Sequence, residues 1–175
     1  MNFIRVNEND GWYKQILEIY KPSFPLYEQR NEEQQRKAFE DNRYHLLAKL
    51  AENDDFKLAS FISYWDFDSY VYIEHFAVNS IMRGQNIGSS SLKLFADLIK
   101  KPVLLEIDPL VDDISKSRFH FYEKLGYQLN TYKHFHPAYN PEFKPHELLV
   151  LSYPEKIDQK QYDQFRHDLE YVVMK

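Results

Sequence analysis

Two periodic patterns of apolar and polar residues, one typical of helices and one typical of strands, divide the chain into segments. Apolar residues three or four positions apart indicate helices over residues 11–20, 88–100, 113–125 and 155–175. Runs rich in β-branched and aromatic residues, or of alternating polarity, indicate strands over residues 2–7, 44–51, 56–65, 70–78, 103–107, 127–135 and 146–152. Polar, helix-forming residues at 31–40 add a short surface helix. This order of elements predicts an α/β fold with a mixed sheet.

The ends of several elements can also be predicted. Gly126 follows the helix expected over 113–125 and stands where a left-handed helix cap would be. Two prolines interrupt residues 21–30, which we expect to form a loop, and polar residues 52–55 should form a turn. The tail should bury one apolar helix face, made of Tyr162, Phe165, Leu169 and Val172.

Length, charge and cysteine content narrow the classes of function. A chain of 175 residues suits one domain with a sizeable core. The formal net charge of −5 argues against nucleic acid or an anionic membrane as a partner, because both are usually bound by a basic surface. The absence of cysteine excludes thiol catalysis and disulfides. With neither a signal-peptide pattern nor a run of about 20 apolar residues, we expect a cytoplasmic protein.

The segment RGQNIGSS, residues 83–90, joins an expected strand to an expected helix and holds two of the chain's four glycines. A glycine-rich turn lets main-chain N–H groups approach a phosphate, which the positive end of the helix dipole also attracts. The same residues suit a plain connection whose glycines relieve crowding and whose serines cap the helix. The turn lacks the lysine of a Walker loop and the third glycine of a dinucleotide fingerprint.

A second motif favours the phosphate interpretation. The segment IEHFAVNSIMRGQNIGSSSLKLF, followed further along the chain by FYEKLGY, resembles the GNAT superfamily of N-acetyltransferases. The resemblance covers residues 70–130 most strongly. It implies a single domain over residues 1–175, with a mixed and largely antiparallel sheet flanked by helices. In that fold the splayed central strands form the cofactor cleft, and acetyl-CoA is the cosubstrate.

The resemblance assigns the turn to the pyrophosphate of acetyl-CoA and the preceding strand to its pantetheine arm. The cofactor-binding residues it implies are Phe76, Ala77, Val78, Arg83, Gly84, Gln85, Asn86, Ile87, Gly88, Ser89, Ser115 and Phe119. Asn86 departs from the family signature, which has glycine there. Asparagine is the non-glycine residue that most readily accepts a left-handed backbone, so the turn geometry can survive.

Acetyl transfer to an amine is helped by a base for the amine and an acid for the departing thiolate. The resemblance places the hydroxyl of Tyr122, in FYEKLGY, near the cofactor sulfur as the acid. Two strand carboxylates compete as the base: Glu74 in YVYIEHFAV and Glu106 in VLLEI. Other members of the family carry a glutamate at one or the other place.

Glu74 is the favoured base. Strand alternation places it on one face with Tyr72 and Phe76, and places His75 on the other face. Desolvation among aromatic side chains would raise its pKa toward the range useful to a base. Glu106 is the alternative, in an equally apolar strand. Either carboxylate could instead be structural, tied to backbone amides or to a cationic side chain.

The histidines give only weak support for a metal site. His134 and His136 are two apart on an expected strand and therefore share a face. A bare H-x-H pair, with no HExxH or similar spacing, is common without metal. We therefore expect no metal.

The acceptor amine is expected near the loop PSFPLYEQR, which resembles a loop beside the acceptor in some small-molecule members of the family. Phe24, Tyr27 and Glu28 would form an aromatic and acidic wall suited to a cationic amine. A small-molecule amine is the favoured acceptor, with a protein N-terminus or lysine as alternatives. Two other functions stay open: a sensor that binds acyl-CoA without turnover, and nucleotide or phosphate binding unrelated to acyl transfer. The apolar face of the tail is compatible with a homodimer.

Overall fold

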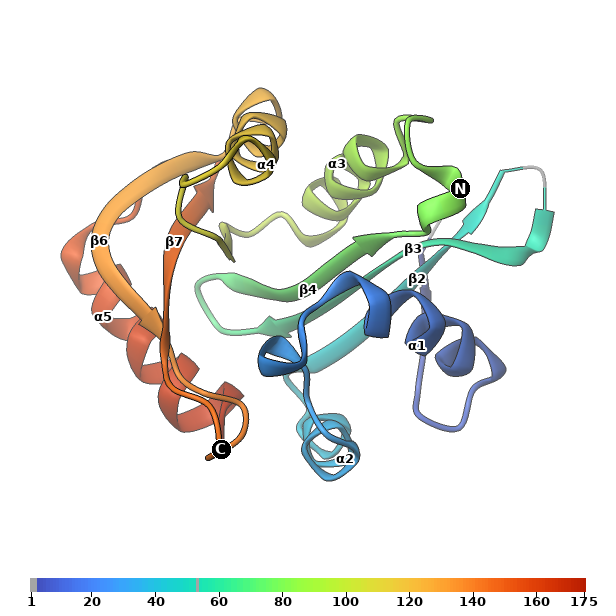
Figure 1. The fold of residues 1–175 in the computed structure, drawn as a ribbon, viewed down its shortest axis with the longest axis horizontal. Coiled ribbons are helices and arrows are strands. Elements are labelled where there is room, and N and C mark those ends of the chain that lie inside the picture. Colours follow the sequence, from blue (N-terminus) through green and yellow to red (C-terminus); the bar gives the residue numbers. More distant parts are fainter. Residues whose placement is uncertain (1–2, 53) are drawn as a thin grey trace. The chain divides into compact units, whose positions relative to one another are not determined.

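The computed structural model describes residues 3–52 and 54–175. The chain forms two compact units, Met1–Lys101 and Pro102–Lys175, called here the first and the second unit. Both contain helices and strands (Figure 1). In the part of the chain that the structure describes, no helix is long and apolar enough to cross a membrane.

The first unit is an antiparallel sheet with helices on both faces. Its described strands follow the order β1-β2-β3-β4. Its elements are β1 (Phe3–Arg5), α1 (Gly11–Ser23), α2 (Glu32–Glu40), β2 (Tyr44–Ala51), β3 (Asp54–Asp66), β4 (Val71–Val78) and α3 (Ile87–Ile99). Figure 1 shows α3 on one side of strands β2 to β4, and α1 and α2 on the other.

Aromatic residues fill both sides of this sheet. On the α1 side, the ring of Tyr20 lies 6.2 Å from the ring of Phe61 in β3. On the α3 side, Tyr64 of the same strand packs 5.0 Å from Phe95. Positions 61 and 64 differ by an odd number, so alternation sends their side chains to opposite faces. Phe61 therefore faces α1 and Tyr64 faces α3, and the β4 residues that pair with β3 follow the same two faces.

A β-bulge interrupts β4 at Glu74, the residue favoured as the base in the sequence analysis. In the pairing of β3 with β4, Ser63 lies opposite His75, but the next pair is Tyr64 opposite Ile73. Glu74 is therefore an extra residue without a counterpart in β3.

The bulge turns two successive side chains to the same face. Glu74 bonds the side chain of Arg30, and His75 bonds the main chain of Glu28, both in the segment between α1 and α2. Phe76 pairs with a β3 residue on the α3 side. The predictions that His75 points away from Glu74, and that Glu74 shares a face with Phe76, are therefore wrong. An added residue shifts a pattern whose period is two.

The second unit is another antiparallel sheet, in the order β5-β7-β6. Its elements are β5 (Val103–Ile107), α4 (Asp113–Lys124), β6 (Gln128–His136), β7 (His146–Tyr153) and α5 (Gln159–Asp168). Helix α5 packs on β6, where the rings of Tyr132 and Tyr162 stack with centroids 4.1 Å apart.

Several predicted boundaries are confirmed and others move. The strands expected at 44–51 and 103–107 have those bounds, and Gly126 has the left-handed φ of +92° expected of a helix cap. Helix α1 continues through Pro22, past the predicted end at residue 20. β3 begins at Asp54, inside the expected turn. Residue 53 of that turn and residue 2 of the first expected strand lie outside the described residues.

The C-terminal helix departs from its predicted register. It starts at Gln159 rather than residue 155, and it ends in a π-helical turn over Leu169–Val173. Three of the four predicted apolar residues are buried, but Val173 is buried in place of Val172. A π-helical turn holds more residues than an α-helical turn and so rotates the following residues around the axis.

Candidate active site

The turn before α3 presents a row of main-chain N–H groups. Within the described residues, the amides of Gly84 to Ser89 have no hydrogen-bond partner in the chain. The next amide, that of Ser90, donates to the carbonyl of Asn86 at 3.0 Å. Residues 83–86 are exposed. Successive unpaired amides at the positive end of a helix can bind an anion.

Asn86 gives this turn its left-handed step. Its φ and ψ are 60° and 15°, and Gly84 is also left-handed with φ of 79°. The prediction that asparagine can hold this conformation is confirmed. The Asn86 side chain makes no capping bond to α3, whereas Asn31 caps α2 through the amide of Gln34 at 2.8 Å. Its amide group is therefore not engaged in capping.

A buried lysine lies under the first turn of α3. Lys49 of β2 donates from Nζ to Oγ of Ser90 at 2.6 Å. Burial lowers the pKa of this ammonium group, and the carboxylate of Glu52 acts in the opposite direction. The lysine adds a cation to the positive end of the helix. It was not predicted, because strand alternation alone does not single it out.

The end of β4 carries the residues expected to pair with the pantetheine arm. Residues 76–78 pair in antiparallel register with residues 60–62 of β3. Phe76 and Val78 are half-buried and Ala77 is buried. Their contact with a cofactor stays a prediction.

Glu74 is held by two donors. Arg30 donates from Nε to Oε1 at 2.7 Å, and the indole N–H of Trp65 donates to Oε2 at 2.7 Å. The Glu74 side chain is 0% exposed. Burial alone would raise its pKa, but the Arg30 charge and these bonds hold the pKa below its ordinary value. The predicted upward shift is wrong, and the geometry fits the alternative of a carboxylate tied to a cation.

The segment between α1 and α2 lies against β4. His75 donates from Nε2 to the main-chain oxygen of Glu28 at 2.8 Å, and its ring lies 4.7 Å from the ring of Phe24. Tyr27 is exposed. The structure therefore brings two of the three predicted acceptor residues next to the bulge, while their contact with a substrate stays a prediction.

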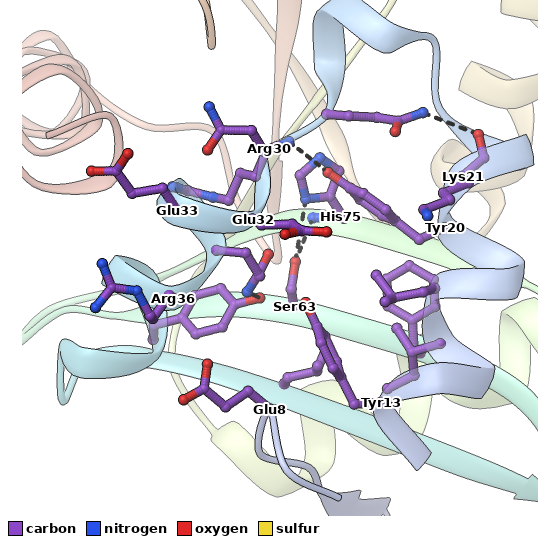
Figure 2. Close-up of a pocket in the computed structure, with 18 of the residues that line it drawn as sticks. Glu8, Tyr13, Tyr20, Lys21, Arg30, Glu32, Glu33, Arg36, Ser63 and His75 are labelled. Carbon is purple, nitrogen blue, oxygen red and sulfur yellow. Dashed lines mark hydrogen bonds between the residues drawn. The ribbon is translucent and has the colours of Figure 1, made fainter. Parts of the chain in front are cut away.

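A cavity of about 680 Å³ opens beside this segment, between α1, α2 and the sheet (Figure 2). Tyr20 lines one side of it, and Ser63 and His75 lie at the sheet. The carboxylates of Glu8 and Glu32 both raise the pKa of the Tyr13 hydroxyl, after the larger effect of its burial, so they lie near that hydroxyl. Of the predicted acceptor residues at 24, 27 and 28, none lines the cavity.

Glu106 of the second unit has a different set of partners. Its Oε2 lies 2.5 Å from Nε2 of His134, and its Oε1 lies 3.9 Å from Nε2 of His136. The Glu106 side chain is 4% exposed and that of His134 is 0% exposed. The prediction that the two histidines share a face is confirmed. Their contact with a glutamate 28 residues away in sequence was not predicted.

Tyr122 lies near the end of α4 in an aromatic cluster. Its ring is 5.4 Å from that of Tyr127, which is 5.3 Å from that of Tyr153. Burial raises the pKa of Tyr122 to about 12, and the nearby Arg118 acts in the opposite direction. The hydroxyl therefore keeps its proton at neutral pH. Among the described residues it has no hydrogen-bond partner.

The other two cofactor residues expected on α4 have local roles. Ser115 completes a capping box: its amide donates to Oδ1 of Asp112 at 2.7 Å, and its Oγ accepts from the amide of Asp112 at 3.1 Å. Phe119 is half-buried. Their contacts with a cofactor stay predictions. Over the described residues, no group of three or more His, Asp or Glu side chains has a geometry that could hold a metal ion.

Comparison with known proteins finds a protein family that this chain matches. The family model described as "Acetyltransferase (GNAT) family" matches residues 13–127. A protein of Bacillus subtilis (strain 168) named "Putative acetyltransferase YjbC" is 30% identical over 123 residues, which are 65% of this chain and 55% of that protein. The match thus spans little more than half of that relative's length.

Solved structures extend the likeness to nearly the whole chain. A structure described as a "Putative acetyltransferase from GNAT family", from Bacteroides thetaiotaomicron, superposes with a TM-score of 0.91 and 28% identity, covering 99% of this chain and 98% of that chain. An aminoglycoside 6′-N-acetyltransferase complexed with coenzyme A has a TM-score of 0.59 and 14% identity, covering 90% and 100%. The predicted fold class, largely antiparallel strands flanked by helices, is confirmed.

Proposed function

We propose that this chain, which belongs to the acetyltransferase (GNAT) family, moves an acetyl group from acetyl-CoA to a primary amine. The amine attacks the thioester carbon directly, so that a C–N bond forms and the C–S bond breaks. The products are an amide and coenzyme A. No covalent enzyme intermediate is needed, which agrees with the absence of cysteine.

The turn before α3 is the observation that carries this proposal. Its six unpaired amides, from Gly84 to Ser89, can receive the oxygens of a pyrophosphate. The ammonium of Lys49 beneath the same helix end strengthens the positive field there. A neighbouring structure described with coenzyme A supports this choice of ligand.

Tyr122 is proposed as the acid that protonates the departing thiolate. Its hydroxyl is protonated at neutral pH and has no internal acceptor among the described residues. The proton is therefore available for an incoming sulfur.

Glu106 is proposed as the base that takes the amine proton, with Glu74 as the alternative. Both Glu74 oxygens hold strong donors and its pKa is lowered, which makes a poor proton acceptor at neutral pH. Glu106 instead has imidazoles beside it, with Nε2 of His134 at Oε2 and Nε2 of His136 3.9 Å from Oε1.

A cationic small-molecule amine is the proposed acceptor. The segment with Phe24, Tyr27 and Glu28 lies on β4, and the adjoining cavity has Glu8 and Glu32 near its Tyr13 wall. The cavity lining holds three carboxylates, of Glu8, Glu32 and Glu33, and three cations, of Lys21, Arg30 and Arg36. The carboxylates near Tyr13 are the groups that would receive an ammonium ion.

The proposal is tested by measuring free thiol released from acetyl-CoA over a panel of small amines, with a lysine peptide and an N-terminal peptide included. We expect release with at least one cationic small amine, and a decrease in kcat of about 100-fold in Tyr122→Phe. Tight binding of acetyl-CoA with no release over the whole panel would instead support the sensor. Displacement of bound coenzyme A by ATP would point to a nucleotide site.

Asn86 provides a test of the turn itself. Asn86→Gly keeps the left-handed backbone without a side chain, so we expect it to bind acetyl-CoA at least as tightly as the parent. Asn86→Val should bind more weakly, because a β-branched residue resists positive φ. Calorimetric titration measures both. A loss of binding in Asn86→Gly would show that the asparagine side chain itself contacts the ligand.

A further inference from the structure

The contact between Glu106 and His134 is short and almost fully buried. Oε2 of Glu106 and Nε2 of His134 are 2.5 Å apart. Two such atoms approach so closely only when a proton lies between them. The imidazole therefore fixes the position of one oxygen of this carboxylate.

The opposite side of the imidazole is held by the C-terminal helix. Nδ1 of His134 lies 3.0 Å from the hydroxyl of Tyr162 in α5, and that hydroxyl lies 3.2 Å from the main-chain oxygen of Lys133. A hydroxyl has one proton for these two acceptors. When it donates to the carbonyl, Nδ1 must carry a proton itself. When it donates to Nδ1, the imidazole is neutral with its proton on Nε2.

Packing against neighbouring side chains also fixes the position of the Tyr162 ring. It stacks on Tyr132 at 4.1 Å and 4°, and the Tyr132 hydroxyl donates to the main-chain oxygen of Ile157 at 3.0 Å. The ring of His134 also stacks against Phe165 of α5, with centroids 5.7 Å apart. Packed rings leave the imidazole little freedom to rotate.

Other titratable groups also face this carboxylate. His136 of β6 lies 3.9 Å from Oε1, and Glu106 influences the ionisation of both His146 in β7 and Tyr162 in α5. His136 donates from Nδ1 to the carbonyl of Pro137 at 2.6 Å, which leaves its Nε2 turned toward Glu106. The second oxygen of Glu106 thus faces a second imidazole.

We propose that His134 is a positioning residue for Glu106, and that Tyr162 of the C-terminal helix sets the orientation of His134. This inference rests on the proposed function, in which Glu106 receives the amine proton. His134 and Tyr162 hold Oε2 in place without touching either substrate, and Oε1 receives the proton. A role in catalysis is thereby given to α5, far along the sequence from the motifs of the family.

Two substitutions at position 134 separate this role from simple packing. A glutamine places its amide nitrogen near the position of Nε2 and can still donate to Glu106. An asparagine places its nitrogen near Nδ1, so it can still reach Tyr162 but loses the bond to Glu106. We expect His134→Gln to keep kcat within a factor of about 3, and His134→Asn to lower kcat by about 30-fold, since small misplacements of a catalytic group are costly. The KM for acetyl-CoA should be unchanged in both variants.

Tyr162→Phe is a milder variant that keeps the ring and its stacking. We expect it to lower kcat by about 5-fold, whereas Tyr171→Phe, at an exposed position of the same tail, should leave kcat unchanged. Folded His134→Asn with the parent's kcat would overturn the proposal. So would a His134→Gln variant as impaired as His134→Asn.

A measurement without substrates distinguishes failure of this inference from failure of the proposed function. The nitrogen chemical shifts of the His134 ring should change in Glu106→Gln and stay the same in Glu74→Gln. Unchanged shifts in Glu106→Gln would contradict the contact itself. If the parent enzyme releases no thiol with any amine while these shifts respond as expected, the proposed function fails and the Glu106–His134 contact stands.

Discussion

Glu74 and Glu106 are two buried glutamates in apolar strands, and different kinds of side chain contact the two carboxylates. In the first unit, Glu74 is bonded to a guanidinium group and an indole N–H, donors that keep their protons at every physiological pH. In the second unit, Glu106 is bonded to an imidazole and lies near another. An imidazole, unlike a guanidinium group, does not carry a permanent positive charge.

The difference teaches which buried carboxylate can do proton chemistry. A fixed positive charge stabilises the ionised form of Glu74 and opposes its protonation. That carboxylate fastens Arg30, and with it the segment between α1 and α2, to β4. The partners of Glu106 are imidazoles instead of a guanidinium group. We therefore propose that Glu74 is structural and that Glu106 takes part in the reaction.

The largest effect on stability should come from Glu74→Gln. The variant leaves the guanidinium of Arg30 buried without its counter-charge, which typically costs about 3 kcal/mol in the free energy of unfolding. For a chain of this size, that corresponds to a decrease in Tm of about 6–12 °C. Glu40→Gln is the matched control, because the Arg36–Glu40 pair is exposed and should contribute less than about 0.5 kcal/mol. Equal losses in both variants would show that the Glu74 ion pair is not an anchor.

The hydrogen bond from the indole donor should contribute less. Trp65→Phe keeps a benzene ring but loses the five-membered ring with its N–H, so it removes the hydrogen bond to Oε2 of Glu74, which contributes about 2 kcal/mol, together with some packing at a buried position. Trp12→Phe is the control, since its indole has no hydrogen-bond partner among the described residues. Urea unfolding measures both. If Trp65→Phe loses no more stability than Trp12→Phe, the indole does not help to hold the carboxylate.

The pH dependence of stability should show the same contrast on a smaller scale. The pKa of Glu74 is lowered by folding from an ordinary value of 4.5. Its contribution to stability is therefore complete above pH 4.5 and is lost as the pH falls through the lower folded value. Between about pH 5 and pH 3, the unfolding free energy should fall less steeply in Glu74→Gln than in the parent. Parallel curves would contradict the lowered pKa.

Much of the fold could be predicted, because its signals are local. The strand at 103–107 and the left-handed Gly126 follow from runs of apolar residues and from a glycine after a helix. The left-handed Asn86 follows from the known preference of asparagine. Each of these depends on residues only a few positions apart.

The errors lie where a local period is interrupted. A single extra residue at Glu74 reverses strand alternation, and no residue type at that position signals the bulge. A π-helical turn shifts burial from Val172 to Val173 in the same way. Periodicity predicts an element well until an insertion changes its phase.

The charge partners of the site could not be predicted at all. Arg30 and Glu74 are 44 residues apart, and Glu106 and His134 are 28 apart. Both pairs form only because the sheet brings separate segments together. An isolated glutamate in an apolar strand therefore suggests either a base or a structural carboxylate, and only the partner decides between them.

The central claim is tested most directly by comparing kcat for thiol release in Glu106→Gln and Glu74→Gln, at saturating acetyl-CoA and amine and at a temperature where both variants are folded. We expect Glu106→Gln to lower kcat by about 100-fold or more, the usual effect of losing a general base. Glu74→Gln should keep kcat within a factor of about 3 of the parent, despite its lower stability. The reverse result, a folded Glu74→Gln without turnover beside an active Glu106→Gln, would contradict the assignment of the two glutamates.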